Sequence, residues 1–158
     1  MDIKGLSADS LQGDKAYIRF FDELKGGKNT FDVSDTPDIA PLLFAASMLF
    51  GGGTFKGAKR LMYKETDRIS AMKDELIKFG GELCLNGDTA AVKCDCIKKP
   101  DCAVSSHGDH RIAMALTFLL SITGGCIEDA LCVSKSYPDY FSDIKGLGIK
   151  VKLCEDKK

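Results

Sequence analysis

The chain has 158 residues, of which 44% are hydrophobic and 28% charged, and its net charge is -1. This composition is typical of a folded globular protein with one good core or two small ones. The balanced charge, without a basic block, excludes a nucleic-acid-binding surface, and no apolar run reaches the roughly 18 to 20 residues of a membrane-spanning helix. Because the amino terminus, MDIKGLSADS, lacks the basic-then-apolar order of a signal peptide, we expect a cytoplasmic protein.

Helix and strand patterns alternate along the chain. Apolar spacing and glycine or proline stops predict, in chain order, helices at about 14–24 and 38–50, a strand from 52, a helix at about 66–79, strands at about 82–85 and 89–94, a linker at 98–101, a helix at about 109–122, a strand from 124, a helix at about 138–147 and a last strand. This alternation predicts an α/β fold. The helices at 38–50 and 109–122 are apolar nearly all round, so we expect both to be central and buried.

Two segments of the chain share one order of elements. Residues 52–85 and 124–153 each begin with a glycine turn and a short strand, pass through a polar loop into a helix, break again at glycine and end in an alternating strand. Asp14, Asp67 and Asp139 each lie at the start of a helix, where a carboxylate can accept hydrogen bonds from free N–H groups. The sequence therefore predicts repeated units whose equivalent loops lie on one side.

Cysteine is frequent, with seven residues, and Cys94, Cys96, Cys102 and His107 superficially offer thiolates and an imidazole to zinc. The alternation of Val92, Cys94 and Cys96 with mostly polar neighbours favours a half-buried strand instead, in which a reduced cysteine acts as a small hydrophobe. None of the paired spacings of common zinc modules is present, and the odd count argues against a full disulfide framework. We expect reduced, metal-free cysteines.

Charged side chains gather where the two apolar helices are expected to begin. One helix follows Asp35-Thr36-Pro37-Asp38 and the other begins at Asp109-His110-Arg111. Helix capping explains the aspartates when each is taken alone. Cations at a helix amino terminus, however, oppose the helix dipole unless an anion lies between them and the helix. The position of His110 and Arg111 therefore indicates an anion site.

The segment Lys64-Glu65-Thr66-Asp67-Arg68 places two cations and two carboxylates before another predicted helix. Lys64 and Arg68 are four positions apart and Glu65 and Arg68 three, so a solvated face of ion pairs explains the pattern as well as a ligand site does. Lys135 lies in the matching loop of the second unit. If equivalent loops share one side, these charges come together.

Four motifs occur in the order DTPDIAPLL, KETDRI, HGDHRIAMAL and SKSYPDYF. In this order and spacing they closely resemble the carboxy-terminal domain of the 3-phosphoshikimate 1-carboxyvinyltransferase (enolpyruvylshikimate-phosphate synthase) family, over about residue 10 to the end. The resemblance implies transfer of the enolpyruvyl group of phosphoenolpyruvate to the 5-hydroxyl of shikimate 3-phosphate, with release of phosphate and with no metal or organic cofactor.

The resemblance also implies a fold and a domain organisation. Members of the family close two domains over both substrates, and each domain is an inside-out α/β barrel of repeated βαβαββ units in which small sheets surround buried helices. Residues 1–158 then correspond to a carboxy-terminal domain fragment that lacks the amino-terminal domain, and we expect the fragment alone to be inactive. The connection at 25–29 is short and leaves little room for strands of the first unit.

Roles for individual residues follow from the resemblance as well. It implies three groups that move protons: Asp38, Glu65 and Lys135. Asp38 matches the carboxylate that receives the proton of the attacking hydroxyl, and Glu65 an acid/base at the phosphoenolpyruvate methylene. The substrate-binding residues share a cationic or ionisable side chain: Lys64, on the shikimate 3-phosphate side, and Arg68, His110 and Arg111, with Lys135 again, around phosphoenolpyruvate.

Two other functions fit part of the pattern. A non-catalytic module that binds a phosphorylated acid is compatible with the missing half of the site. An enolpyruvyl transferase that acts on a UDP-sugar shares the fold, although the pairing of KETDR with DHR favours the shikimate enzyme.

Overall fold

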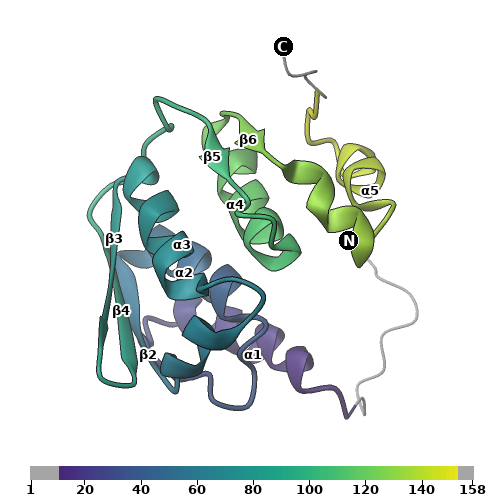
Figure 1. The fold of residues 1–158 in the computed structure, drawn as a ribbon. Helices are drawn as coiled ribbons and strands as arrows, with labels where there is room; N and C mark the ends of the chain where they lie inside the picture. Colours follow the sequence, from purple (N-terminus) through teal and green to yellow (C-terminus); the bar gives the residue numbers. More distant parts are fainter. Residues whose placement is uncertain (1–10, 153–158) are drawn as a thin grey trace.

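The computed structural model describes residues 11–152. In chain order it contains η1 (Gly13–Lys15), α1 (Ala16–Lys25), β1 (Thr30–Asp32), α2 (Ala40–Ser47), η2 (Met48–Phe50), β2 (Gly52–Lys56), η3 (Lys59–Tyr63), α3 (Arg68–Leu76), η4 (Ile77–Phe79), β3 (Gly81–Asn86), β4 (Thr89–Cys94), β5 (Val104–Ser105), α4 (His110–Thr123), β6 (Ile127–Glu128), η5 (Ala130–Lys135) and α5 (Tyr140–Gly146), where η marks a short 3₁₀ helix. The predicted α/β class is confirmed (Figure 1).

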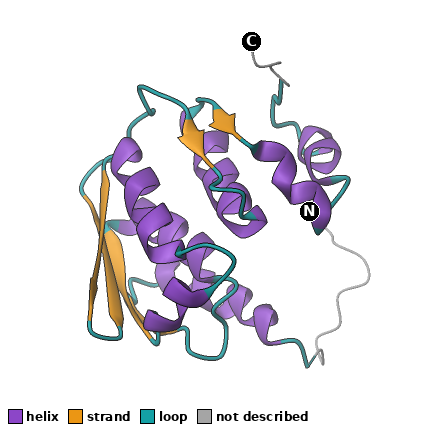
Figure 2. Cartoon of the chain, in the orientation of Figure 1, coloured by secondary structure: helices purple, strands orange, loops and turns teal. Residues whose placement is uncertain are grey.

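The strands form two separate sheets. The larger has the order β1-β2-β4-β3, with β1 parallel to β2 and the other pairs antiparallel, and the smaller pairs β5 with β6 in parallel. Burial alternates along β3 and β4, so one face of the larger sheet is in the core and the other faces solvent. Helices α2 and α3 lie on the core face, with α4 beyond them (Figure 2).

The repeat predicted from the sequence is present in most of its length. The elements β1, α2, β2, α3, β3 and β4 make one complete βαβαββ unit, and β5, α4, β6 and α5 repeat its first four elements. The short strands β1 and β5, each opening a unit, were not predicted. Residues 25–29 contain no strand beyond the end of α1, as their length indicated.

The predicted last strand is wrong over its described part. Residues 149–152 form no strand, and the remainder of the prediction lies outside the described residues. A strand needs a neighbouring backbone to satisfy its N–H and C=O groups. The N–H of Ile149 instead donates to the carbonyl of Ile144 at the end of α5, so the chain closes that helix rather than joining a sheet.

The core forms around the two apolar helices. Both were predicted to be central. Helix α2 is buried along nearly its whole length, whereas α4 buries six of its fourteen residues and packs against α2. Phe55 of β2 stacks on Phe31 of β1, with ring centroids 5.6 Å apart, and meets Phe44 of α2 edge-on at 4.9 Å. These rings fasten the sheet to α2. Within residues 11–152, no helix has the length and apolar character needed to cross a bilayer.

The approach of β2 to β4 depends on one glycine. Gly52 has a φ of 115°, in the region that side-chain-bearing residues rarely adopt, and an added Cβ would lie 2.1 Å from the carbonyl oxygen of Val92. Gly52 is the first residue of β2, so the packing of this strand against β4 requires glycine at the point where the strand begins.

Replacing Phe55 by alanine should cost about 3 to 5 kcal/mol of unfolding free energy, because a fully buried ring that contacts two others leaves a cavity. Phe50, which is 45% exposed, is the matched control, and Phe50→Ala should cost less than about 1 kcal/mol. Urea unfolding followed by circular dichroism measures both, and the wild-type chain should unfold in one cooperative transition. Equal losses for the two variants would contradict this core.

Candidate functional site

The predicted site residues follow the carboxyl ends of parallel strands. Asp38 lies between β1 and α2. Lys64 and Glu65 lie between β2 and α3, and Arg68 is the first residue of α3. Asp109 lies between β5 and α4, and Arg111 is the second residue of α4. In open α/β sheets this is the side on which ligands bind, because the loops and helix amino termini converge there. Side-chain contacts bring these three loops together. The repeat predicted instead that the loop of Lys135 would meet the loop of Lys64 and Arg68, and no side-chain hydrogen bond or ion pair within residues 11–152 joins those two loops.

The centre of the cluster is the guanidinium of Arg68, the first residue of α3, whose side chain is 0% exposed. Its Nε lies 2.8 Å from Asp109 Oδ2, its Nη1 2.9 Å from Asp38 Oδ1 and its Nη2 2.6 Å from Glu65 Oε2. Burial by itself would lower the pKa of Arg68, but hydrogen bonds with Asp109 and Asp38 outweigh it and raise that pKa. Arg68 is therefore a permanent buried cation that holds three carboxylates from three loops.

Asp38 gathers a second set of contacts. Besides Arg68, its carboxylate lies 3.3 Å from Lys64 Nζ and 2.9 Å from Arg111 Nη2. Burial would raise the pKa of Asp38, but the hydrogen bond with Arg68 and the charges of Arg111 and Lys64 together lower it. Asp38 is thus ionised, and its carboxylate is shared by three cationic side chains.

The aspartates at helix starts have different roles. Asp67 caps α3, its Oδ1 accepting from the N–H groups of Ile69 and Ser70 at 3.1 and 3.0 Å, and Asp109 caps α4 by accepting from Arg111 N–H at 2.8 Å. The capping interpretation of Asp38 is wrong, because α2 begins at Ala40 and its N-cap residue is Ile39, with no side-chain cap. Asp139 also precedes its helix without a capping hydrogen bond.

Asp14 does not cap a helix either, since it lies inside η1. Asp109 was assigned only a capping role from the sequence, and its ion pair with Arg68 was missed. The sequence feature that could have predicted this ion pair is the position of Asp109, directly before His110 and Arg111 at the start of an apolar helix.

The other predicted residues lie at the rim of the cluster. Glu65 is 59% exposed, and Lys64 and Arg111 are partly exposed. His110 is half-buried in the first turn of α4, and Lys135 is exposed at the end of η5, which packs against α4. The side chains of His110 and Lys135 form no hydrogen bond or ion pair with any residue that the structure describes. The cluster of ion pairs therefore joins five of the seven predicted residues and leaves these two beside it.

The cluster, which we define as Asp38, Lys64, Glu65, Arg68, Asp109 and Arg111, contains three cations and three carboxylates and is neutral overall. An incoming anion competes with these carboxylates for the N–H donors of the cations. Arg111 offers one further donor, since its Nε is buried and lacks a hydrogen-bond partner within residues 11–152. The arrangement can bind a planar or tetrahedral anion at its rim, where Arg forks match carboxylate and phosphate oxygens.

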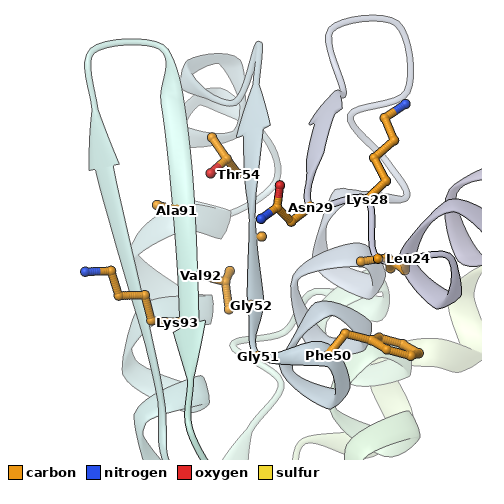
Figure 3. Close-up of a pocket in the computed structure, with 12 residues that line it drawn as sticks. Leu24, Lys28, Asn29, Phe50, Gly51, Gly52, Thr54, Ala91, Val92 and Lys93 are labelled. Carbon is orange, nitrogen blue, oxygen red and sulfur yellow. The ribbon is translucent and has the colours of Figure 1, made fainter.

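A hollow of about 260 Å³ lies at the other end of the same strands. Figure 3 shows it at the amino ends of β1 and β2, lined by Leu24, Phe50 and the Gly51–Gly53 run, with the side chains of Lys28 and Lys93 extending away from it. It is separate from the cluster, which follows the carboxyl ends of those strands. Within the described residues, no group of three or more His, Cys, Asp or Glu side chains is arranged to hold a metal ion.

Comparison with known proteins gives consistent matches. A family model described as EPSP synthase (3-phosphoshikimate 1-carboxyvinyltransferase) matches residues 2–144. The 3-phosphoshikimate 1-carboxyvinyltransferase of Clostridium botulinum is 35% identical over 166 aligned positions, which cover 92% of this chain and 38% of the relative. The enzyme of that name from Methanosarcina mazei is 36% identical over 135 positions, covering 82% of this chain and 31% of the relative.

A solved structure of EPSP synthase from Acinetobacter baumannii superposes with a TM-score of 0.64 at 26% identity, over 73% of this chain and 28% of that one. The chain therefore spans less than two fifths of the length of the Clostridium and Methanosarcina relatives.

Replacing Asp38 by asparagine should destabilise the chain near neutral pH by about 1 to 3 kcal/mol, because three cations lose their shared carboxylate. The folded-state pKa of Asp38 is lowered, so its stabilising effect is present above the unfolded pKa and is lost as pH falls through the folded one. Wild type and Asp38→Asn should therefore converge in stability below about pH 4. Urea unfolding across pH measures this, with Asp74→Asn on exposed α3 surface as the control; a constant gap would contradict it.

Proposed function

The chain belongs to the EPSP synthase (3-phosphoshikimate 1-carboxyvinyltransferase) family, and we propose that it forms one wall of an active site for enolpyruvyl transfer. The reaction moves the enolpyruvyl group of phosphoenolpyruvate to the 5-hydroxyl of shikimate 3-phosphate and releases phosphate. The observation that carries the proposal is the cluster of three cations and partly exposed carboxylates at the amino termini of α3 and α4. Residues 1–158 then act as the carboxy-terminal domain, and an amino-terminal domain outside this sequence supplies the second wall.

Phosphoenolpyruvate presents a carboxylate and a phosphate, and the rim of the cluster offers matching donors. Lys64 and Arg111 are partly exposed, and in this structure both form ion pairs with Asp38. A ligand anion replaces Asp38 on these two groups and gains the unused Nε of Arg111. Arg68 is fully buried, so it takes part by exchanging Glu65, its most exposed partner, for a ligand oxygen. His110 and Lys135 complete the set from α4 and η5.

The proton chemistry needs groups that change protonation. Addition of the hydroxyl to the central carbon of phosphoenolpyruvate removes a proton from that hydroxyl and adds one to the methylene. Elimination of phosphate then takes a proton back from the methyl group. Asp38 is a weak base while three cations surround it. When ligand anions draw Lys64 and Arg111 away, the pKa of Asp38 rises and the carboxylate becomes able to accept the hydroxyl proton.

Glu65 and Lys135 are the other two groups proposed to transfer protons. Glu65 is more than half exposed at the rim of the cluster, which suits an acid/base acting on a methylene held between this chain and the proposed amino-terminal domain. Closure of that domain would exclude water and strengthen each charge contact. Every step is served by side chains and substrates, so the proposal invokes neither a metal nor an organic cofactor.

The finer architecture belongs to the same proposal. One complete βαβαββ unit, a second unit with the same opening elements, and apolar helices α2 and α4 between small sheets support an inside-out α/β barrel. A cytoplasmic location remains the prediction made from the sequence.

A non-catalytic module that binds a phosphorylated acid is a second candidate, because all cations of the cluster come from this one chain. The names of the relatives favour the shikimate enzyme over a UDP-sugar transferase.

The isolated chain should bind phosphoenolpyruvate weakly, at about millimolar concentration, because one wall retains the cations but leaves the ligand in water. Amide chemical shifts near Lys64, Arg68 and Arg111 should move during a titration followed by NMR. Arg111→Ala should remove most of this response, whereas the matched control Arg19→Ala, on the exposed face of α1, should keep it. No phosphate should be released when both substrates are supplied.

Two results would contradict this proposal. The absence of any ligand-dependent shift at the cluster would remove its binding basis. Robust phosphate release by the isolated chain would show a complete active site within these 158 residues and would overturn the division into two walls.

A further inference from the structure

A second buried charge on α3 lies outside the cluster. Glu75 is 2% exposed, and its carboxylate is fully occupied. Its Oε2 accepts from Lys78 Nζ at 2.8 Å and from the N–H of Ser105 at 2.9 Å, and its Oε1 lies 3.0 Å from both Lys78 Nζ and His107 Nε2. A carboxylate with so little exposure is tolerated only because cationic and N–H donors surround it.

The donors other than Lys78 come from the segment that leads into α4. Ser105 ends β5, and His107 adopts a φ of 52°, the left-handed region that a histidine rarely occupies. Such a conformation persists only where surrounding contacts determine it. The contact between His107 and Glu75 is one of them, and the N–H of His107, donating to Ser105 Oγ at 3.1 Å, is another.

The segment then continues to the cluster through a chain of short-range hydrogen bonds. Gly108 N–H donates to Ser106 Oγ, Asp109 N–H to the Ser106 carbonyl, and Arg111 N–H to Asp109 Oδ1. The backbone from 105 to 111 is therefore one continuous hydrogen-bonded structure. Its first part is attached to Glu75, and its last part carries His110 and Arg111.

Arg68 and Glu75 are seven residues apart on α3, so both project from the same face of the helix. Arg68 holds Asp109, and Glu75 holds the backbone at Ser105 and the ring of His107. Two buried groups of opposite charge on one helix thus fix both ends of the same segment. Ser106 is held from the other side as well, its N–H donating to the Glu128 carbonyl and its Oγ to the Asp129 carbonyl. Of the contacts made by α3, those of Glu75 hold residues 105 and 107 and that of Arg68 holds residue 109.

We propose that Glu75 is a positioning residue for the anion-binding site, which fixes the segment 105–111 so that Arg111 reaches Asp38 and His110 lies beside the cluster. Glu75 does not contact the cluster itself. It acts through Ser105 and His107, and its removal releases the backbone that carries Arg111 while leaving Arg111 chemically intact. Loss of anion affinity then follows from loss of order in this segment.

The first test needs no ligand and uses amide hydrogen exchange of the 158-residue chain. In Glu75→Gln, the amides of His107, Gly108, Asp109 and Arg111 should exchange faster by about tenfold relative to the Leu43 amide of α2, as the loss of one charged hydrogen bond gives. A purely structural role would lower protection at Leu43 and at the segment alike. Glu82→Gln, on the exposed side of β3, is the matched control and should change nothing.

A second variant keeps the test decisive if Glu75→Gln does not fold. His107→Asn changes a partly exposed side chain, tolerates the left-handed backbone and is too short to reach Glu75. His107→Asn should speed hydrogen exchange of the same amides, by a smaller factor than Glu75→Gln does. Uniform acceleration in both variants, or none at the segment in either, overturns the proposal.

The second readout is phosphoenolpyruvate binding, and it rests on the proposed function. Glu75→Gln should raise the Kd by about threefold to tenfold, the scale of one lost hydrogen bond. An unchanged Kd alongside faster segment exchange overturns the positioning role. If the wild-type chain shows no phosphoenolpyruvate binding, the proposed function fails, and hydrogen exchange still decides whether Glu75 fixes the segment.

Discussion

A guanidinium that is wholly removed from water costs several kcal/mol in desolvation unless carboxylates surround it. Arg68 meets this requirement with Asp109, Asp38 and Glu65, which lie 41, 30 and 3 residues away in sequence. The burial of one side chain therefore fixes the loops before α2, α3 and α4 relative to one another. Because α4 belongs to the second unit, the same ion pairs join the two units on the side where the site forms.

The cluster also sets a limit on its own chemistry. The cations that suit a phosphorylated acid are neutralised by the carboxylates proposed as acid and base, and Asp38 is held ionised by Arg68, Arg111 and Lys64. In this state the groups stabilise the fold rather than react. Ligand anions that take over Lys64 and Arg111 would at once gain their binding contacts and restore the basicity of Asp38, so that binding and activation are one event.

The sequence predicted the long elements well, because the apolar patterns of α2 and α4 and the glycine stops report burial directly. It missed β1 and β5, which are too short to show a period, and it placed a strand where Ile149 closes α5 instead. The motifs named five of the six cluster residues, but did not predict that Arg68 is buried or that Asp38 forms no cap on α2. No sequence pattern pointed to a role for Glu75, because its partners Ser105 and His107 are about 30 residues away and meet it only through tertiary packing.

The most direct test of this account is a double-mutant cycle between Arg68 and Asp109, measured by urea unfolding of the 158-residue chain. Arg68→Met removes the cation, and Asp109→Asn removes the charge while retaining an oxygen that can still cap α4. We predict a coupling energy of at least about 2 kcal/mol, because either single variant leaves a buried charge without its partner and the double variant does not. A coupling energy near zero would contradict the central role of Arg68.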